Sequence, residues 1–206
     1  AKAGLNVADT RVLEVSGKDV LLVRRFDRDT HATGHPTRRH MLSAMTLLDL
    51  DEYAVRTGEA SYLELADVLR QYARDFEGDG RELFRRMVFN ILIGNTDDHA
   101  RNHACFWDGT ALDLTPGYDI CPLPRLGHSA DLAMVVGHQG RAATLNNALS
   151  QAERFGLSEH EAAECVDAMK QIVEAHWKEL FSAAGMEAGD IEYLAKATIL
   201  SPSIFD

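Results

Sequence analysis

The chain has 206 residues, 46% of them hydrophobic, and a formal net charge of −11. This length predicts one domain with room for two lobes, and the acidic balance argues against nucleic-acid binding by the whole surface. Three cysteines without a CxxC motif exclude a zinc or disulfide framework and indicate a reducing compartment. With neither a signal peptide nor a bilayer-length apolar run, we expect a cytoplasmic protein without membrane association.

The first part of the chain has the pattern of a β-hairpin. Apolar residues predict strands over Val7–Val15 and Val20–Val23, joined by a turn at Ser16–Asp19. The residues that follow are charged, and Asp29–Arg39 is predicted to be a polar loop.

A basic cluster lies after this hairpin, consisting of Arg24, Arg25, Arg28, Arg38 and Arg39. A solvated face and a local patch for an anionic partner are equally good interpretations of it. Asp27 lies among these arginines and could pair with Arg25 or Arg28, with a catalytic role as the alternative.

Helical periodicity begins at His40 and predicts a helix that ends before Thr57-Gly58. Ser61 and Glu64 predict a capping box for a helix over Tyr62–Tyr72. Gly78-Asp79-Gly80 is predicted to break the pattern again. The next predicted helix, Arg81–Ile93, is apolar on nearly all sides near its end and is therefore buried. Gly94 is predicted to terminate it.

Asp108-Gly109 stands between two apolar runs, Ala104–Trp107 and Ala111–Leu114, and this pattern predicts a hairpin. Residues 126–141 give no clear prediction. The remainder is predicted to be helical, over Thr144–Arg154, Ser158–Ala184 and Asp190–Thr198. Ser158 is predicted to cap the second of these helices with Glu161. Trp177 is expected in the core. The fold class predicted from these elements is α+β, mainly α.

The segment between Asn90 and Pro122 carries the candidate chemistry. Asp97 is separated from Asn102 by four residues, and Asp119 follows after the predicted hairpin. Phosphoryl transfer needs a carboxylate that takes the acceptor's proton, and an amide with a second carboxylate that holds magnesium. The Asp-x-x-x-x-Asn spacing occurs often by chance, but the buried helix before it and the hairpin after it make it more specific.

Other interpretations of the same side chains stay open. Asp97 and Asp98 could solvate and cap a helix end. Only Asp97 has the catalytic spacing, so Asp98 is expected to be structural or exposed. His99 and His103 are four residues apart and could bind a transition metal, but the glutamate that follows the first histidine in zinc proteases is absent.

The residues from Ile93 to His103, IGNTDDHARNH, followed by Leu114–Ile120, LTPGYDI, resemble the HipA family of bacterial serine/threonine kinases. These kinases are the toxins of HipBA-type toxin–antitoxin modules. Val23–Arg28 is similar to the segment that links the family's two kinase lobes, and His40–Ala44 is similar to the helix that follows it. The resemblance covers most of the chain.

The resemblance implies a role for each matching residue. Asp97 would be the catalytic base, and His99 would lie beside the phosphates. Asn102 and Asp119 would hold magnesium. The remaining residues would contact ATP: Tyr118 would line the nucleotide pocket, and the backbone of the Arg24–Phe26 segment, with Arg24 and Phe26 at its ends, would face the adenine.

A kinase also needs a phosphate-covering loop and a strand lysine. The lysines before Asp97 are Lys2 and Lys18, and no Gly-x-Gly-x-x-Gly motif occurs. We therefore expect a truncated kinase that transfers phosphate poorly on its own. Residues 1–28 would be the hairpin and interlobe segment of the N-terminal lobe, and residues 29–206 the helical, kinase-like C-terminal lobe.

The main hypothesis is therefore part of an ATP- and magnesium-dependent protein kinase. By resemblance, it would phosphorylate a tRNA synthetase or translation factor, and a HipB-like, DNA-binding antitoxin would restrain it. DNA would be contacted only through the antitoxin. Two alternatives remain: a non-catalytic docking module, and a magnesium-dependent small-molecule kinase or phosphohydrolase that uses the same carboxylates.

Overall fold

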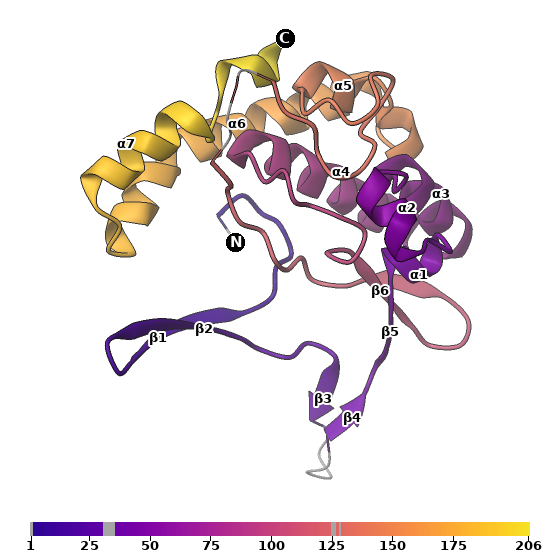
Figure 1. Cartoon of the computed structure of the whole chain (residues 1–206). Coiled ribbons are helices and arrows are strands. Elements are labelled where there is room, and N and C mark those ends of the chain that lie inside the picture. The colour runs from indigo at the N-terminus through magenta and orange to yellow at the C-terminus, as the bar shows by residue number, and fades with distance from the viewer. Residues whose placement is uncertain (1, 31–35, 125–126, 128) are drawn as a thin grey trace.

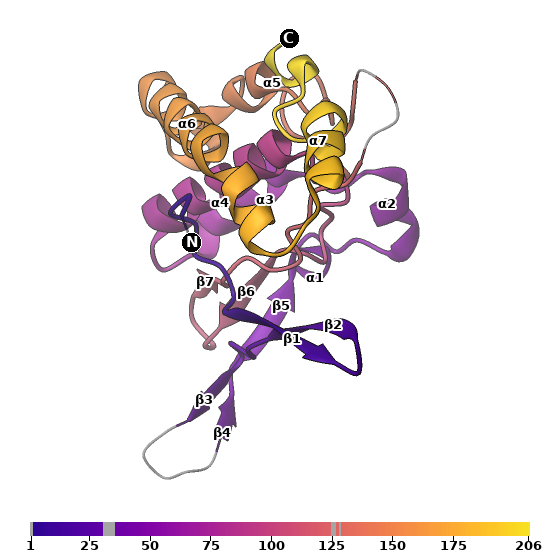
Figure 2. The ribbon, with the colours of Figure 1, turned by 90° about the vertical axis from the view of Figure 1, so that its left-hand side faces the viewer.

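The structure is a computed structural model that describes residues 2–30, 36–124, 127 and 129–206. It is a mixed, mainly helical fold, which confirms the predicted fold class. Figures 1 and 2 show a body of helices from which the first β-hairpin and a second, short one project. In the described residues no helix is long and apolar enough to cross a membrane.

The elements follow one another with the strands mostly first. The strands are β1 (Thr10–Val15), β2 (Lys18–Val23), β3 (Arg28–Thr30), β4 (Pro36–Arg38), β5 (His40–Ser43), β6 (Ala104–Trp107) and β7 (Leu112–Leu114). The α-helices are α1 (Ala44–Leu47), α2 (Glu52–Thr57), α3 (Tyr62–Tyr72), α4 (Phe76–Ile93), α5 (Leu145–Leu149), α6 (Glu159–Ala183) and α7 (Ala188–Ala197). Two 3₁₀ helices, η1 (Ala152–Phe155) and η2 (Pro202–Phe205), complete the list.

The β1–β2 hairpin turns at Ser16 and Gly17, which have φ angles of 54° and 73°. Two positive φ angles in a two-residue turn match the twist of the flanking strands. The predicted turn was therefore two residues too long, because Lys18 already pairs with Val15. The predicted first strand was also too long, since Val7 instead forms an isolated bridge with Gly117.

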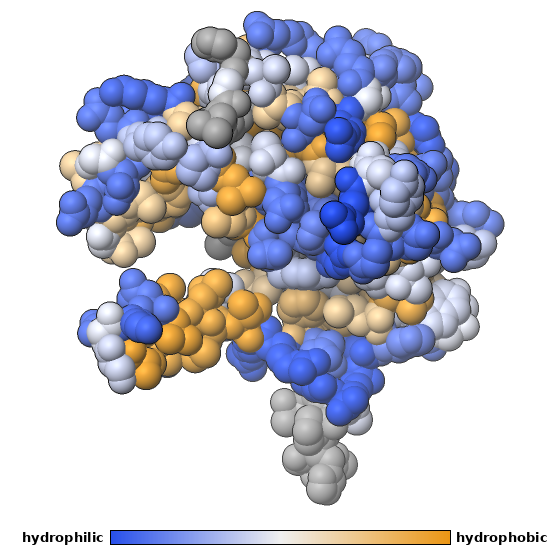
Figure 3. Space-filling model, in the orientation of Figure 1, coloured by the Kyte–Doolittle hydropathy of each residue, from blue (hydrophilic) through white to orange (hydrophobic). Residues whose placement is uncertain are grey.

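Both faces of this hairpin are exposed. Val12 and Leu21, which pair across the strands, are 62% and 63% exposed. Figure 3 shows hydrophobic residues gathered on the hairpin, with a hollow between it and the helices above it. The hairpin therefore buries little of its own apolar surface within this chain.

The predicted helix from His40 is wrong at its start. His40–Ser43 is the strand β5, which pairs with β6 to form an antiparallel sheet in the order β5-β6-β7. Ser43 then caps the short helix α1, because its hydroxyl accepts a hydrogen bond from the Thr46 amide at 3.2 Å. The predicted loop Asp29–Arg39 is also partly wrong: β3 and β4 pair within it, and residues 31–35 lie outside the described part.

Helix α4 is the buried centre of the body and is longer than predicted. It starts at Phe76, where the Asp75 carboxylate accepts a hydrogen bond from the Gly78 amide at 3.1 Å. Gly80 does not break the helix. A Cβ atom there would lie 2.5 Å from the Phe155 carbonyl oxygen, so glycine permits close packing against η1. Gly94 ends α4 with φ 68°, as predicted.

Most other local predictions are confirmed. Helix α3 begins at Tyr62 behind Ser61, whose hydroxyl accepts from the Leu63 and Glu64 amides. The predicted cap of Ser158 with Glu161 before α6 is also confirmed, and there the capping box is complete. The β6–β7 hairpin also forms as predicted. Trp177 of α6 is 8% exposed and belongs to the core. The predicted helix Thr144–Arg154 is divided into α5 and η1.

Candidate active site

The loop between α4 and β6 brings two of the predicted site residues into contact. Asn102 is 5% exposed, and its Nδ2 atom donates a hydrogen bond to Asp119 Oδ2 over 3.1 Å. Asp119 lies at the surface with φ 59°, a left-handed conformation that is unfavourable for a non-glycine residue. No described residue donates a hydrogen bond to the Asn102 side-chain oxygen, so this oxygen is available to a ligand.

Asp97 lies at the surface of the same loop. Its carboxylate makes no hydrogen bond or ion pair with any residue that the structure describes. A base must be free to accept a proton from its substrate, and Asp97 satisfies this condition. Its predicted role stays a prediction.

Asp98, the next residue, is buried at 2% exposure. Its Oδ2 atom accepts hydrogen bonds from the Tyr62 hydroxyl, from Asn90 Nδ2 at 2.6 Å and from His103 Nε2 at 2.9 Å. Burial raises the pKa of this carboxyl, but the His103 imidazole and the three donors outweigh burial and hold the pKa below its usual value. Asp98 is therefore an ionised structural group. Of the two expectations for this residue, a structural role and exposure to solvent, the first is confirmed and the second is wrong.

The two histidines of the loop differ in their surroundings. His103 donates from Nε2 to Asp98, whereas His99 is half-buried and its side chain makes no described hydrogen bond; the Nδ1 atoms of both histidines are buried without a described partner. In the described residues no group of three or more His, Cys, Asp or Glu side chains is arranged to hold a metal ion. The described geometry therefore gives no support to a transition-metal site at His99 and His103. Magnesium is a different case, since one or two carboxylates with phosphates and waters suffice to bind it.

Tyr118 and Phe26, both predicted to contact the nucleotide, lie against each other. Their ring centroids are 5.7 Å apart, and Phe26 also meets the edge of Phe106 at 6.1 Å. The Tyr118 hydroxyl donates to the Arg101 carbonyl at 2.7 Å, and burial raises its pKa to about 12. The tyrosine therefore joins the segment around Phe26 to the loop as a neutral, packed group.

Arg24 lies on the surface, with its side chain 80% exposed and 3.9 Å from Asp9. It is one of the residues that line a pocket of about 260 Å³, together with the rest of Val23–Asp27 and Met41. Asp27 pairs with Arg25 at 2.8 and 2.6 Å and with Arg28 at 3.7 Å, as the ion-pair alternative predicts. The Arg25 hydrogen bonds are the main reason that the pKa of Asp27 falls to about 2.

A model of the HipA-like C-terminal domain matches residues 1–177. The chain belongs to this family. Over 123 residues it is 28% identical to Y4mE of Sinorhizobium fredii, a protein named as a candidate kinase, and the match covers 58% of this chain and 29% of that protein. Over 132 residues it is 25% identical to the serine/threonine-protein kinase toxin HipA of Shewanella oneidensis, covering 57% of this chain and 30% of the toxin.

The HipA-like fold is also found in a solved structure, the Shewanella oneidensis complex of HipA, HipB and operator DNA. The TM-score is 0.74 and the sequence identity 18%, with 94% of this chain and 50% of that chain covered. The likeness to this structure therefore shows the fold. The chain spans less than half the length of the curated relatives it matches and half of this structural match.

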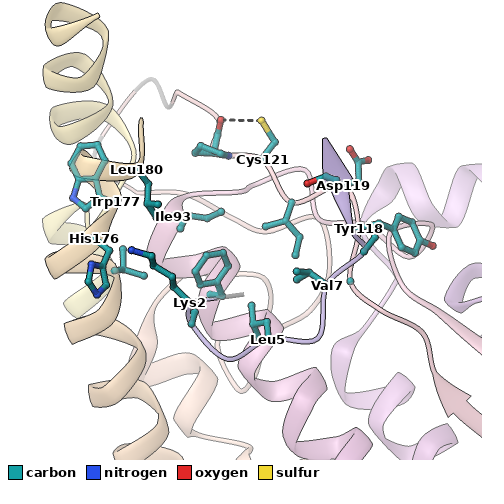
Figure 4. A pocket seen from close by; sticks show the side chains of 18 of the residues that line it. Lys2, Leu5, Val7, Ile93, Tyr118, Asp119, Cys121, His176, Trp177 and Leu180 are labelled. Atoms are coloured by element: carbon teal, nitrogen blue, oxygen red, sulfur yellow. Dashed lines mark hydrogen bonds between the residues drawn. The ribbon is translucent and has the colours of Figure 1, made fainter. Parts of the chain in front are cut away.

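A larger cavity of this HipA-like chain, of about 650 Å³, opens next to Asp119. Its walls come from the N-terminal segment, the β1–β2 hairpin, the end of α4 and helix α6, and they are mostly apolar. Figure 4 shows Lys2 extending toward His176 and Trp177, on the side opposite Asp119. Lys18 lies at the start of β2 with an exposed side chain.

Sequence reasoning missed Arg86, a buried residue of α4 with 2% exposure. Its guanidinium donates to the Thr115 carbonyl at 2.7 Å, to the Asn6 carbonyl at 3.2 Å and to Glu82 at 2.9 Å. It thereby fastens the segment that carries Tyr118 and Asp119 to α4. An arginine among the apolar residues of the predicted helix was the signal that could have identified it.

Proposed function

We propose that this chain is the catalytic lobe of a HipA-like serine/threonine protein kinase that uses ATP and magnesium. The observation that carries the proposal is the 3.1 Å contact between Asn102 and Asp119. These two residues come from separate segments, one before β6 and the other after β7. The Asn102 amide nitrogen makes this contact, and the oxygen of the same amide and the Asp119 carboxylate are hard ligands that suit magnesium. Asn102 lies on the same loop as the unpaired Asp97.

Bound ATP and magnesium would supply the transferable γ-phosphoryl group and the positive charge that neutralises it. Asn102 and Asp119 would hold the ion. The Asp97 carboxylate would take the proton of a seryl or threonyl hydroxyl while the hydroxyl oxygen bonds to the γ-phosphorus. The bond from that phosphorus to the bridging oxygen would break, and ADP would leave.

The remaining site residues would bind the nucleotide. By resemblance, His99 would lie beside the phosphates. Its buried Nδ1 has no described partner and could take one there, although His103 and His176 share this feature. Tyr118 and Phe26 would line the adenine side, next to the pocket that Arg24 helps to line. Lys2 and Lys18 do not lie beside Asp119, so we propose that the chain alone transfers phosphate poorly.

The partners proposed for the parent kinase follow from the relatives. A HipB-like antitoxin would restrain it, because the similar Shewanella protein is in a complex with HipB and operator DNA. DNA would be contacted only through that antitoxin, and the net charge of −11 favours protein partners over direct DNA contact. The substrate would be a protein of the translation machinery, such as a tRNA synthetase or translation factor.

Metal binding tests the proposal on the chain as it is. Mn²⁺, used as a spectroscopic substitute for magnesium, would be titrated with a non-hydrolysable ATP analogue, and free Mn²⁺ followed by electron paramagnetic resonance. We expect Asp119→Asn to weaken Mn²⁺ binding by roughly tenfold or more, since a charged ligand is lost. The matched control is Asp131→Asn, whose carboxylate pairs with Arg141. Equal affinities in all three proteins would overturn the metal assignment.

The acceptor needs a separate assay. Labelled ATP would be offered with seryl and threonyl peptides, with small alcohols and with water alone, using a parent protein that carries the phosphate-binding lysine. Transfer to peptides that is lost in Asp97→Asn supports the protein kinase. Transfer only to small alcohols or to water would favour the small-molecule kinase or the phosphohydrolase.

The exposed hairpin favours a second candidate function, a docking module. The apolar faces of β1 and β2 and the adjoining cavity of about 650 Å³ would receive a β-rich polypeptide that completes the nucleotide site. Mixing the chain with the N-terminal half of a HipA-like kinase would then create nucleotide binding that neither piece has alone. Unchanged nucleotide binding in the mixture would count against this candidate.

A further inference from the structure

We propose that the hydrogen bond between Asp98 and His103 is a staple that sets the spacing between the base Asp97 and the metal ligand Asn102. Asp98 directly follows Asp97, and His103 directly follows Asn102. The staple therefore joins the two ends of the loop that carries the proposed chemistry. Asp98 and His103 are positioning residues, and this role rests on the proposed function.

The staple is buried and tightly formed. His103 Nε2 and Asp98 Oδ2 are 2.9 Å apart, and both residues are 2% exposed. Because the lowered pKa leaves Asp98 ionised, its oxygen accepts and His103 Nε2 carries the hydrogen. A hydrogen bond to a charged group without competing water is among the stronger ones in proteins.

The staple is anchored in the helical body. The Tyr62 hydroxyl of α3 and Asn90 Nδ2 of α4 donate to the same Asp98 oxygen. The Tyr62 ring meets the His103 ring edge-on, with centroids 5.4 Å apart. Asn95 donates to Asn90 Oδ1 at 3.1 Å and ties the start of the loop to the same network. Two helices thus determine where the Asp98 carboxylate lies.

Other contacts also hold this loop: the Tyr118 hydroxyl donates to the Arg101 carbonyl at 2.7 Å, the Arg101 guanidinium pairs with Glu52, and the Ala44 amide donates to the His103 carbonyl at 2.8 Å. The Asn102 amide donates to the His99 carbonyl at 2.8 Å, and the Met45 amide of α1 donates to the Ala100 carbonyl at 3.2 Å. The side-chain bond from Asn102 to Asp119 is the described link to the other metal ligand. These contacts fix the backbone beside Asn102 but none of them replaces the link from the His103 side chain to the helical body. If the staple opens, we expect Asn102 to shift relative to Asp119 within the limits that these contacts set.

The alternative is that the network only adds to the stability of the core. Two variants of one residue separate these possibilities. His103→Leu removes the donor, whereas His103→Gln keeps an N–H group that can reach Asp98. The matched control is Asn147→Ala, because Asn147 is 1% exposed and holds the 139–142 turn through hydrogen bonds to Gln139, Gly140 and Ala142. It damages a buried polar network elsewhere in the chain.

Amide hydrogen exchange on the whole chain is the first readout, and it needs no metal or nucleotide. In His103→Leu we expect the amides of residues 97–102 to exchange roughly tenfold faster or more relative to those of α4, the size expected for one lost bond to a charged group. His103→Gln should restore most of the protection. Asn147→Ala should change both sets of amides together. Uniform changes in His103→Leu as well would overturn the staple.

Mn²⁺ affinity is the second readout and separates the staple from the proposed function. His103→Leu should weaken Mn²⁺ binding in the same direction as Asp119→Asn. If Asp119→Asn has no effect but the loop amides loosen in His103→Leu, the staple holds and the metal assignment is wrong. If Asp119→Asn weakens Mn²⁺ binding but His103→Leu changes neither readout, the staple is wrong.

Tyr62→Phe provides the test if His103→Leu does not fold. It removes one donor to Asp98 and keeps the packed ring. We expect faster exchange confined to the same residues, 97–102, and smaller than for His103→Leu, because Asn90 and His103 still hold Asp98. Unchanged exchange at those amides would overturn the proposal.

Discussion

The helical body and the β1–β2 hairpin differ in how their apolar side chains are covered. Phe84, Met87 and Ile91 of α4 are fully buried, whereas Val12 and Leu21 of the hairpin are 62% and 63% exposed. An isolated two-stranded hairpin is marginally stable in water at best. The loop with the candidate site is therefore supported by a core within this chain. The hairpin is held by its own cross-strand pairs and turn, and its apolar faces stay exposed.

The strongest test of this contrast is the removal of a core ring. Phe84 meets Phe155 edge-on with centroids 5.5 Å apart, so Phe84→Ala leaves a cavity between α4 and η1. We expect it to lower the free energy of unfolding by about 3–5 kcal/mol, measured by urea denaturation. Val12→Ala is the hairpin counterpart and should stay within about 0.5 kcal/mol of wild type. Similar losses in both variants would contradict the contrast.

Glycine substitutions sharpen the comparison at the level of packing. Gly80→Ala places a methyl group 2.5 Å from the Phe155 carbonyl oxygen, and we expect a destabilisation of about 1–3 kcal/mol. Gly189→Ala is the matched control, because Gly189 is also helical but has open space around its Cβ position. That variant should be stabilised by about 0.5–1 kcal/mol through helix propensity. Thermal unfolding of both proteins checks the opposite signs.

The same glycine shows where sequence reasoning succeeds and fails. Ser61, Gly94 and the Asp108-Gly109 turn were predicted correctly because caps and turns depend on neighbouring residues. Gly80 was taken as a break, since nothing near it in sequence reveals that Phe155 packs there. The strand β5 was missed for the same reason, because its partner β6 lies far along the chain.

The candidate site shows the same difference between features that depend on neighbouring residues and features that depend on distant ones. The spacing, the predicted elements around it and the resemblance to the HipA family together pointed to Asp97, Asn102 and Asp119, and the structure brings the last two into contact. Their predicted roles, and the division of the chain at residue 28, stay predictions. The buried network around Asp98 was not foreseen, because Tyr62 and Asn90 come from two helices whose approach no local pattern encodes.

The exposed hairpin faces allow a test in the opposite direction. The double variant Val12→Thr and Leu21→Thr replaces a cross-strand pair with residues that also favour strands. We expect the free energy of unfolding to change by less than about 0.5 kcal/mol, because neither side chain is in the core. Binding of a fluorescent apolar dye should fall, since the open apolar surface shrinks. A clear loss of stability would mean that the hairpin packs against the body.

The smallest expected effect concerns a surface carboxylate of the body, and it depends on pH. The Ser158 amide and hydroxyl hydrogen-bond to Glu161, and together with Arg81 they hold the pKa of Glu161 at about 2 in the folded chain. Because this pKa is lower than that of a glutamate in the unfolded chain, the ionised Glu161 stabilises the fold above pH ~4.3. That contribution is lost as the pH falls toward 2.

Glu161→Gln keeps the shape of the cap at the start of α6 but cannot titrate. We therefore expect its midpoint of thermal unfolding to lie below that of wild type at pH 7 and to approach it as the pH falls toward 2. Exposure to solvent keeps this difference small. Glu164→Gln is the control: its carboxylate lies 3.4 Å from His160 on the exposed face of the same helix and takes no part in the cap. A gap between Glu161→Gln and wild type that stays constant with pH would show that the cap does not depend on the carboxylate charge.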